Sequence, residues 1–424
     1  MKRGYRLVVR SAPGILRFRM PPGTTPFPYL APMIATSVST ELLRDALGVF
    51  VAKTRANLAD MPARPTTWSF AMDGDYTKWP EGFFEIGNWT NGFFAGMGVL
   101  ALKSTSDNGF LDLLDGLKPL FGAKVEGEHA RNTMHDLGFL YSPYAVAIYQ
   151  HTGGTTYRDL ALKAARTLAG RYISNGGYFR AWGRMDEVGT EYDGLAIIDC
   201  LMNMPLLHWA SRETGDPSFR EMALRHTNNT LRHFVRPDDS VYHSFRFDRD
   251  TGAAVGPDNY CGHAVESHWA RGNSWAMYGF ALAYKHGGNE AHLETSLRVS
   301  RKFVSCLDDG VVPLWDFRLT PGYPPLRDSS AAAVAVCAIQ ELESIGVSDN
   351  LLSDAKQAML STLLSPEYFD SDPAVRGVLR KGEVGDGADS GRRLYAAKYA
   401  YTSWGDYFLM EAISRELGQQ ITWW

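Results

Sequence analysis

The 424-residue sequence has little cysteine and no long apolar run. None of its four cysteines belongs to a CxxC pair, and their spacings match no zinc-binding pattern. We therefore expect reduced thiols in the core, a reducing compartment and no metal site. No stretch of about 18 apolar residues occurs, so no membrane span is expected. The cysteines are Cys200, Cys261, Cys306 and Cys337.

A marked excess of one charge is also missing. The net charge is −4 and no long basic run occurs, so nucleic acid is not an expected partner. Residues 1–35 are basic, but arginines interrupt their apolar residues, so they lack the continuous apolar core of a secretory signal. We predict that residues 1–35 form a flexible extension and that the protein is cytoplasmic.

The common nucleotide-binding and nucleophile motifs are absent as well. The sequence contains no GxSxG, no Walker motif and no GxGxxG in a strand context, and GDGAD at 385–389 lacks the spacing of a calcium loop. No cofactor is therefore expected. Aromatic residues, in contrast, are abundant at 12%. Aromatic-rich clefts often bind sugars, although the same residues can simply fill a large core.

A helical pattern repeats along the chain. In each of four copies an apolar helix ends in a glycine turn, and a charged amphipathic helix follows. This pattern is typical of inner helices covered by outer ones, because one pair cannot bury its own apolar face. With pairs at 40–60 and 83–103 and a last helix at 402–418, about six hairpins are available. The turn glycines are Gly153, Gly215, Gly287 and Gly346.

Six hairpins that close on themselves predict an all-α (α/α)6 barrel over residues 36–424, a single domain whose first helix is capped by Thr40. An open array or a seventh pair remains an alternative. The long inserts fall before the inner helices, so we expect them to gather at one end of the barrel and to form the cleft there.

Residues 194–211 predict a buried helix with one acid in its apolar surface. Asp199 is that acid, and Asn203, four residues on, is the one polar residue near it on the same face. Desolvation should raise the pKa of Asp199 toward neutrality, as general acid–base catalysis requires. The alternative is an aspartate that anchors the helix by hydrogen bonds. The apolar residues at helical spacing are Leu195, Ile198, Met202 and Leu206.

Other polar residues fall at or near the predicted starts of inner helices. Asp136 precedes one of them, where N-capping is the alternative function. His243 lies in a short strand or loop and is either a ligand contact or a structural residue. Arg271 lies four residues before Trp275, so its guanidinium can lie over that indole or reach an anion in the cleft. We interpret Asp328 as another cap.

Seven segments, in this order, resemble the unsaturated glucuronyl hydrolases of glycoside hydrolase family 88. They cover residues 83 to 415 and are NWTNGFFAGM, MHDLGF, IIDCLMNMPLLHWAS, YHSFRFD, WARGNSWAMYGF, RDSSAAAVA and WGDYFLMEA. The resemblance implies an (α/α)6 barrel, in agreement with the hairpin count. It also implies a substrate with a Δ4,5-unsaturated glucuronic acid at its non-reducing end, as polysaccharide lyases leave. Such an enzyme protonates C4 of the vinyl ether and adds water at C5, after which the hemiketal opens and the glycosidic link breaks.

The resemblance assigns roles to individual residues. It implies that Asp199 is the principal acid/base and that Asp136 is the second carboxylate. The substrate-binding residues that it implies are His135, His243, Arg271, Trp89, Trp275 and Trp182.

The sequence departs from the family at Cys261, where many members carry glutamine before the glycine. Arg392, Arg393 and Lys398 lie where some members bind sulfate, and they could face a sulfate or carboxylate. The alternatives are an unsaturated rhamnogalacturonyl hydrolase of family 105, against which Asp136 argues, and a non-catalytic carbohydrate-binding barrel. We expect a monomer or weak homo-oligomer whose partner is an unsaturated uronic-acid oligosaccharide.

Overall fold

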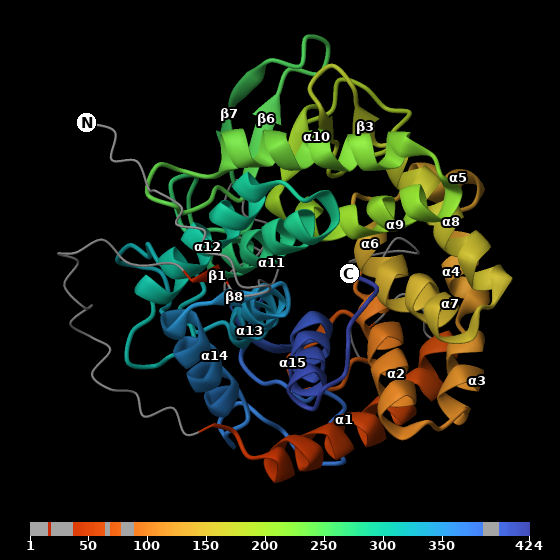
Figure 1. Ribbon diagram of the computed structural model, residues 1–424, viewed down its shortest axis with the longest axis vertical. Coiled ribbons are helices and arrows are strands. Elements are labelled where there is room, and N and C mark those ends of the chain that lie inside the picture. Colours follow the sequence, from red (N-terminus) through yellow and green to blue (C-terminus); the bar gives the residue numbers. More distant parts are fainter. Residues whose placement is uncertain (1–15, 18–36, 64–67, 78–88, 385–397) are drawn as a thin grey trace.

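The computed structural model of the chain describes residues 16–17, 37–63, 68–77, 89–384 and 398–424. In this part of the chain, six helical segments form a closed inner ring (Figure 1). Each segment contacts the next, and the last one contacts the first. The segments are α2 (Asn91–Thr105), α6 (Leu137–Tyr141) continued by η2 (Ser142–Val146) and α7 (Ala147–Thr152), η3 (Ile198–Asn203) continued by α9 (Met204–Thr214), α11 (Ala270–Gly287), α13 (Ser329–Ser344) and α15 (Ser403–Glu416).

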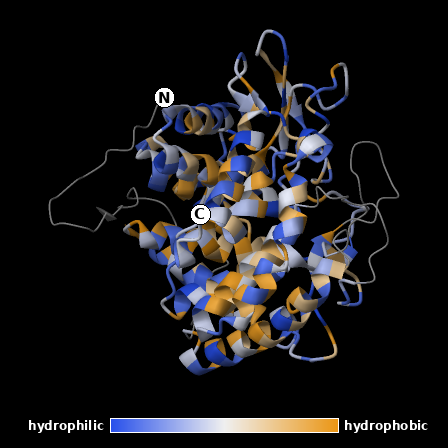
Figure 2. Cartoon of the chain, turned by 90° about the vertical axis from the view of Figure 1, so that its right-hand side faces the viewer, coloured by the Kyte–Doolittle hydropathy of each residue, from blue (hydrophilic) through white to orange (hydrophobic). Residues whose placement is uncertain are grey.

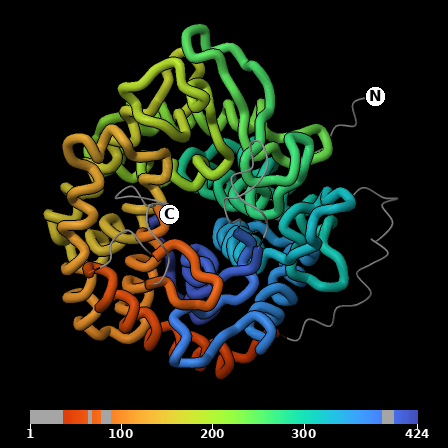
Figure 3. The backbone as a smooth tube through the Cα atoms, turned by 180° about the vertical axis from the view of Figure 1, so that it is seen from behind, coloured from red at the N-terminus to blue at the C-terminus, as the bar shows by residue number. Residues whose placement is uncertain are grey.

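An outer layer of helices covers this ring, and each outer helix contacts at least one inner segment (Figures 1 and 3). The position of a helix in the inner or the outer layer follows from its amino-acid composition. Every residue of α13 from Ser329 to Leu342 is buried, whereas α12 buries one face only and presents charged residues on the other. Figure 2 shows hydrophobic residues, in orange, along the helices of the barrel. The outer helices are α1 (Thr40–Asp60), α3 (Gly109–Asp115), α8 (Thr155–Ala169), α10 (Pro217–Phe234), α12 (Glu290–Ser305) and α14 (Asn350–Leu363).

The predicted all-α (α/α)6 barrel is therefore confirmed. Short helices α4 (Lys118–Lys124), α5 (Gly127–Arg131) and η1 (Met61–Ala63) extend its connections. None of the helices in the described residues is apolar over enough of its length to span a bilayer. All four cysteines are outside disulfides, and of these Cys200 and Cys337 are buried as expected, while Cys261 and Cys306 are only half-buried.

Among the described residues, small sheets lie in the connections around the helices; all are antiparallel except the parallel pair of Leu16–Arg17 with Val347–Ser348. One joins β5 (Leu195–Ile197), β6 (Ser244–Phe247) and β7 (Ala254–Asp258), and another joins β2 (Phe70–Ala71), β10 (Lys398–Thr402) and β9 (Gly382–Val384). Two further pairs are β3 (Tyr172–Ile173) with β4 (Tyr178–Phe179), and β1 (Leu16–Arg17) with β8 (Val347–Ser348). The boundary between extension and barrel at residue 36 stays a prediction.

Residues 194–211 are not one helix, which corrects the prediction. Leu195–Ile197 form strand β5, residues 198–203 form a 3-10 turn, and the α-helix begins at Met204. The cause is pairing with β6, because Leu195 lies opposite Arg246 in that ladder. Gly194 enters the strand at φ 76°, and a Cβ there would lie 1.8 Å from the Phe247 carbonyl oxygen. Helical periodicity in the sequence cannot reveal such a distant partner.

Two predicted helix ends also shift by one residue. The N-cap of α1 is Ser39 rather than Thr40, because the Ser39 hydroxyl accepts a hydrogen bond from the Leu42 N–H at 3.1 Å. The left-handed residue after α11 is Gly288 rather than Gly287. Gly153 and Gly215 end α7 and α9 in the left-handed conformation, as their turns require.

Candidate active site

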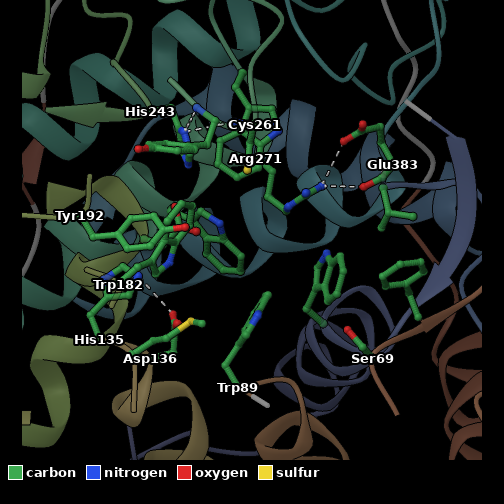
Figure 4. A pocket seen from close by; sticks show the side chains of 18 of the residues that line it. Ser69, Trp89, His135, Asp136, Trp182, Tyr192, His243, Cys261, Arg271 and Glu383 are labelled. Carbon is green, nitrogen blue, oxygen red and sulfur yellow. Dashed lines mark hydrogen bonds and ion pairs between the residues drawn. The ribbon is translucent and has the colours of Figure 1, made fainter. Parts of the chain in front are cut away.

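A cavity of about 410 Å³ opens at the end of the barrel where the inner helices begin (Figure 4). The inserts before these helices supply most of its wall, which confirms the predicted position of the cleft. The structure brings all eight predicted site residues to this one cavity: Asp136, Asp199, His135, His243, Arg271, Trp89, Trp182 and Trp275.

Asp199 reaches the cavity from the first turn of η3. The residue is half-buried, but its Oδ1 atom is buried and has no hydrogen-bond partner among the described residues. Asn203 is engaged elsewhere, since its Oδ1 accepts from the Phe139 N–H at 2.8 Å and its Nδ2 donates to the Asp199 carbonyl. Burial raises the pKa of Asp199 to about 7, and Arg271 opposes this only in part. The carboxyl group is therefore available for proton transfer rather than tied up as a helix anchor.

Asp136 precedes α6, yet its side chain makes no capping hydrogen bond, so the N-cap alternative is wrong. His135 Nε2 lies 3.5 Å from Asp136 Oδ1 (Figure 4). Burial and, next, the charge of Asp199 raise the pKa of Asp136 well above its usual range. Burial also holds the pKa of His135 well below its ordinary value, so the imidazole is neutral. A neutral His135 thus positions a carboxyl group that resists ionisation.

His243 presents a defined hydrogen-bond donor to the cavity. Its Nδ1 accepts from the Tyr260 N–H at 3.0 Å and from the Cys261 N–H at 3.2 Å. Burial lowers the pKa of His243 to about 3, so the ring carries one proton, and that proton belongs on Nε2. Nε2 is buried and has no partner among the described residues. His243 therefore has one N–H free to bind a ligand.

Arg271, the second residue of α11, is fixed by a network of acids and aromatic rings. Its Nη1 pairs with Asp328 and donates to the Glu383 carbonyl at 3.1 Å. The guanidinium carbon lies 4.7 Å from the ring centre of Trp269 and 5.4 Å from that of Trp404. Of the two alternatives for Arg271, stacking on Trp275 is therefore wrong, because the guanidinium lies over Trp269 and Trp404 instead.

Trp275 packs into the aromatic core. Its ring centre lies 5.2 Å from that of Phe139 and 5.4 Å from that of Phe408. Only 1% of Trp275 is exposed, but it still lines the cavity. A spacing of four residues brought Arg271 and Trp275 to neighbouring turns without making them a stacked pair.

The other two predicted tryptophans lie in separate parts of the wall. Trp89 stacks on Trp404 with ring centres 5.3 Å apart. Trp182 makes edge contacts with Tyr260 and Tyr192. In Figure 4, Trp182 and Tyr192 lie near Asp136, whereas Glu383 lies across the cavity with Arg271. Charged groups and aromatic rings therefore meet on both sides of the cavity, with Asp136 near Trp182 and with Arg271 against Trp269 and Trp404.

The cavity residues that sequence reasoning missed include Trp269, Trp404, Tyr260 and Glu383. Trp269 and Trp404 fall within segments that were recognised, and their place at helix starts was a usable signal. Tyr260 and Glu383 lie in inserts without periodicity, and only the fold brings them to the cavity. Asp328 caps α13 as predicted, accepting from the Ser330 N–H at 3.0 Å, but it also pairs with Arg271.

The sulfate-binding prediction is not addressed by the structure. Arg392 and Arg393 lie outside the described residues, and Lys398 is exposed at the start of β10. The described residues contain no group of three or more histidine, cysteine, aspartate or glutamate side chains that could hold a metal ion.

Comparison with known proteins places these features in one family. The chain matches the model of Glycosyl Hydrolase Family 88 over residues 66–363. An unsaturated glucuronyl hydrolase from Bacillus sp. (strain GL1) is 34% identical over 337 residues, which are 77% of this chain and 86% of that protein. An unsaturated chondroitin disaccharide hydrolase from Streptococcus pyogenes serotype M1 is 33% identical over 391 residues, which are 89% of this chain and 92% of that protein. The crystal structure of the Bacillus sp. GL1 enzyme matches with a TM-score of 0.79 at 32% identity and covers 90% of this chain and 99% of that one.

Proposed function

The chain belongs to glycosyl hydrolase family 88, and from this premise we propose that it hydrolyses oligosaccharides ending in a Δ4,5-unsaturated glucuronic acid. The similar proteins carry the names of unsaturated glucuronyl and unsaturated chondroitin disaccharide hydrolases. One observation carries the proposal for this chain: a carboxyl group with a pKa of about 7, Asp199, faces a cavity that it shares with Asp136.

The reaction is a hydration, so one acid has two tasks. Protonated Asp199 delivers its proton to C4 of the vinyl ether, and positive charge develops at C5 and the ring oxygen. The resulting carboxylate then takes a proton from the water that adds to C5. The hemiketal opens, and the glycosidic bond breaks. A general acid–base group in this role accelerates a reaction by a factor of about 10²–10⁴. The carboxylate-separation rule for retaining and inverting glycosidases does not apply, because water does not attack the anomeric carbon.

Asp136 is the second carboxyl group of this reaction. Burial and the charge of Asp199 raise its pKa and so favour the protonated form, which can donate a hydrogen bond instead of adding a second negative charge beside Asp199. His135, buried behind it, fixes its orientation through the contact at 3.5 Å. We assign His135 to positioning Asp136 as well as to the cavity wall.

The remaining residues bind the sugar. His243 Nε2–H and the guanidinium of Arg271 supply hydrogen-bond donors to hydroxyl and carboxylate oxygens. Trp89 and Trp275 flank the flattened unsaturated ring, and Trp182 with its tyrosine neighbours offers a face to the next sugar. The monomeric or weakly associated state and the cytoplasmic location stay predictions.

The test follows loss of the ultraviolet absorbance of the conjugated enoate. Asp199→Asn should keep the fold and abolish turnover of unsaturated glucuronyl disaccharides, because the amide cannot deliver the proton. Asp159→Asn is the matched control, since that carboxylate is 71% exposed on outer helix α8, and it should be fully active. Full activity of Asp199→Asn would refute the assignment.

A substrate panel separates the remaining alternatives. Sulfated and unsulfated glucuronyl disaccharides and unsaturated rhamnogalacturonan products should be compared with the same assay. Turnover of the rhamnogalacturonan products alone would identify the alternative hydrolase. Calorimetric binding without any turnover would identify a carbohydrate-binding barrel.

A further inference from the structure

Arg271 is anchored through one nitrogen only. Nη1 contacts the Asp328 carboxylate, the Ser330 hydroxyl at 3.3 Å and the Glu383 carbonyl at 3.1 Å (Figure 4 shows the contacts to Glu383). Within the described part of the chain, Nε and Nη2 make no hydrogen bond. The rings of Trp269 and Trp404 hold the guanidinium from their faces, and the residue lines the cavity. One edge of the guanidinium is therefore fixed and the other is open.

Asp328 makes the fixed edge possible. It is fully buried, and its two oxygens have separate partners. Oδ1 accepts from the Ser330 N–H at 3.0 Å, which caps α13, from the Ser330 hydroxyl at 2.6 Å and from the Glu383 N–H at 3.2 Å. Oδ2 pairs with Arg271. A single carboxylate thus joins the starts of α11 and α13 to strand β9, with all of its hydrogen-bonding capacity directed to named groups.

We propose that Asp328 is a positioning residue: it holds Arg271 by Nη1 so that the Nε–Nη2 edge faces the substrate. The guanidinium is planar, so fixing one nitrogen and packing the group against two indole rings also restricts the direction of the other two donors. Two parallel N–H donors on one edge match the geometry of a carboxylate. The anion for this edge is the carboxylate of the unsaturated uronic acid, and in this the inference rests on the proposed function.

Asp328→Asn separates the two tasks of the carboxylate. An amide has one acceptor atom and one donor group. If its oxygen keeps the cap of α13, its NH2 group faces Nη1, and if it turns round, the NH2 group faces the Ser330 and Glu383 N–H groups. In either orientation the amide places a donor against donors that the carboxylate had accepted from. Since α11 and Trp269 stay in place, we expect the Arg271 guanidinium to move away from its position against Trp269 and Trp404.

Asp349 offers a matched control. It caps α14 by accepting from the Leu352 N–H at 3.2 Å, and it pairs with Arg301 at 2.7 Å. It does not line the cavity. Asp349→Asn therefore removes a capping carboxylate with an arginine partner, as Asp328→Asn does, but leaves Arg271 untouched.

For an unsaturated glucuronyl disaccharide we expect Asp328→Asn to raise KM about tenfold, with a smaller change in kcat, since a charged hydrogen bond made in both ground and transition states is lost. Asp349→Asn should leave KM unchanged, although both variants lower the melting temperature. Arg271→Lys has a single nitrogen, which Asp328 retains, so it should raise KM similarly. Adding Asp328→Asn to Arg271→Lys should then change KM little, because both act through the same contact.

A crystal structure of Asp328→Asn gives a readout that needs no substrate. Displacement of the guanidinium away from the rings of Trp269 and Trp404 supports the proposal, and an unmoved guanidinium overturns it. The proposal is also overturned if KM is unchanged or lowered in Asp328→Asn. If Asp328→Asn does not fold, an unchanged KM in Arg271→Lys overturns it. A wild-type protein without turnover of the disaccharide would refute the proposed function, while the position of Arg271 in the variant would still decide the role of Asp328.

Discussion

Asp199 combines a buried oxygen that has no partner among the described residues with a place on the cavity wall. Desolvation destabilises its charged form, whereas Arg271 and a backbone hydrogen bond stabilise that form. The balance leaves the pKa of Asp199 at about 7, so both protonation states are populated near neutral pH. This is the property that a group needs if it is to give a proton to carbon and then take one from water.

The pKa of Asp199 predicts the alkaline limb of the pH–rate profile. Below about pH 7 the group is protonated and can protonate C4, and above that pH the acid form is lost. We therefore expect kcat/KM to fall as the pH rises through about 7. Initial rates with an unsaturated disaccharide across neutral pH measure this limb, and Asp159→Asn should reproduce it. A value of kcat/KM that continues to rise above neutral pH would contradict Asp199 as the acid.

Residue chemistry was predictable from the sequence where its cause is local. The apolar neighbours of Asp199 correctly predicted a raised pKa, and the position of Asp328 correctly predicted a cap. The partner of Arg271 was not predictable, because Asp328 and Trp404 approach it from other helices. Spacing along one helix names the possible neighbours, but it does not determine which side chains turn toward each other.

At the scale of elements, the turn η3 is held against α6 rather than by its own helical pattern. Asn203 accepts a hydrogen bond from the Phe139 N–H at 2.8 Å. The backbones approach so closely here that a Cβ on Gly138 would lie 2.3 Å from the Asn203 Cα. This contact joins the segment that carries Asp199 to the one that carries Asp136, and so it sets the relative position of the two acids.

Gly138→Ala should therefore separate the two carboxyl groups. The clash is with backbone, which cannot rotate away, so we expect a destabilisation of about 1–3 kcal/mol and a loss of kcat. Gly122→Ala is the control, because a Cβ on that α4 glycine meets nothing within 4 Å, and it should be neutral or slightly stabilising. Urea unfolding and the absorbance assay measure the two effects. Wild-type stability and activity in Gly138→Ala would show that the contact is dispensable.

Elements with a strong helical period were predicted well, and short elements were not. The apolar helices α7 and α9 end at Gly153 and Gly215, as the pattern indicated. Strand β5 was missed because three residues carry no period of their own and depend on β6, about 50 residues later. The cap at Ser39 was missed by one residue, since Ser39 and Thr40 are both good capping residues.

At the scale of the whole molecule, the C-terminal residues described here lie inside the ring (Figure 1). Trp424 is fully buried, and its Nε1 donates to Glu411 Oε2 at 2.7 Å and to the Tyr407 hydroxyl at 3.1 Å. Its ring stacks on Phe408 and contacts Phe139 edge-on. Because Phe139 also packs against Trp275, an aromatic layer extends from Trp424 to the cavity.

Trp424→Ala should destabilise the entire barrel. Removing a fully buried indole leaves a cavity and takes away the hydrogen bond that Trp424 donates to Glu411 Oε2, so we expect a loss of about 3–5 kcal/mol in the free energy of unfolding. The expected signature is a lower urea midpoint, with one cooperative transition retained. Thr422→Ala, at an exposed position two residues earlier, should leave the midpoint unchanged. Equal midpoints for the two variants would argue against a structural role for Trp424.

The barrel itself was predictable because each hairpin repeats the same division into an apolar and an amphipathic helix. The order of the inner ring followed from chain order, and the cavity followed from the inserts before its helices. The small sheets and the place of Trp424 did not follow, since both depend on contacts between residues far apart in the sequence. Long-range pairing is information that periodicity does not contain.

The contact of α15 with α1 and α2 has a consequence for biosynthesis. The last gap in the inner ring is filled by residues 403–416, which leave the ribosome after the other five inner segments. Until then a nascent chain presents the apolar sides of α2 and α13 to water, as two unfilled edges of an incomplete ring. Chaperones that shield such edges during translation should therefore increase the yield of this protein more than they increase its stability once it is complete.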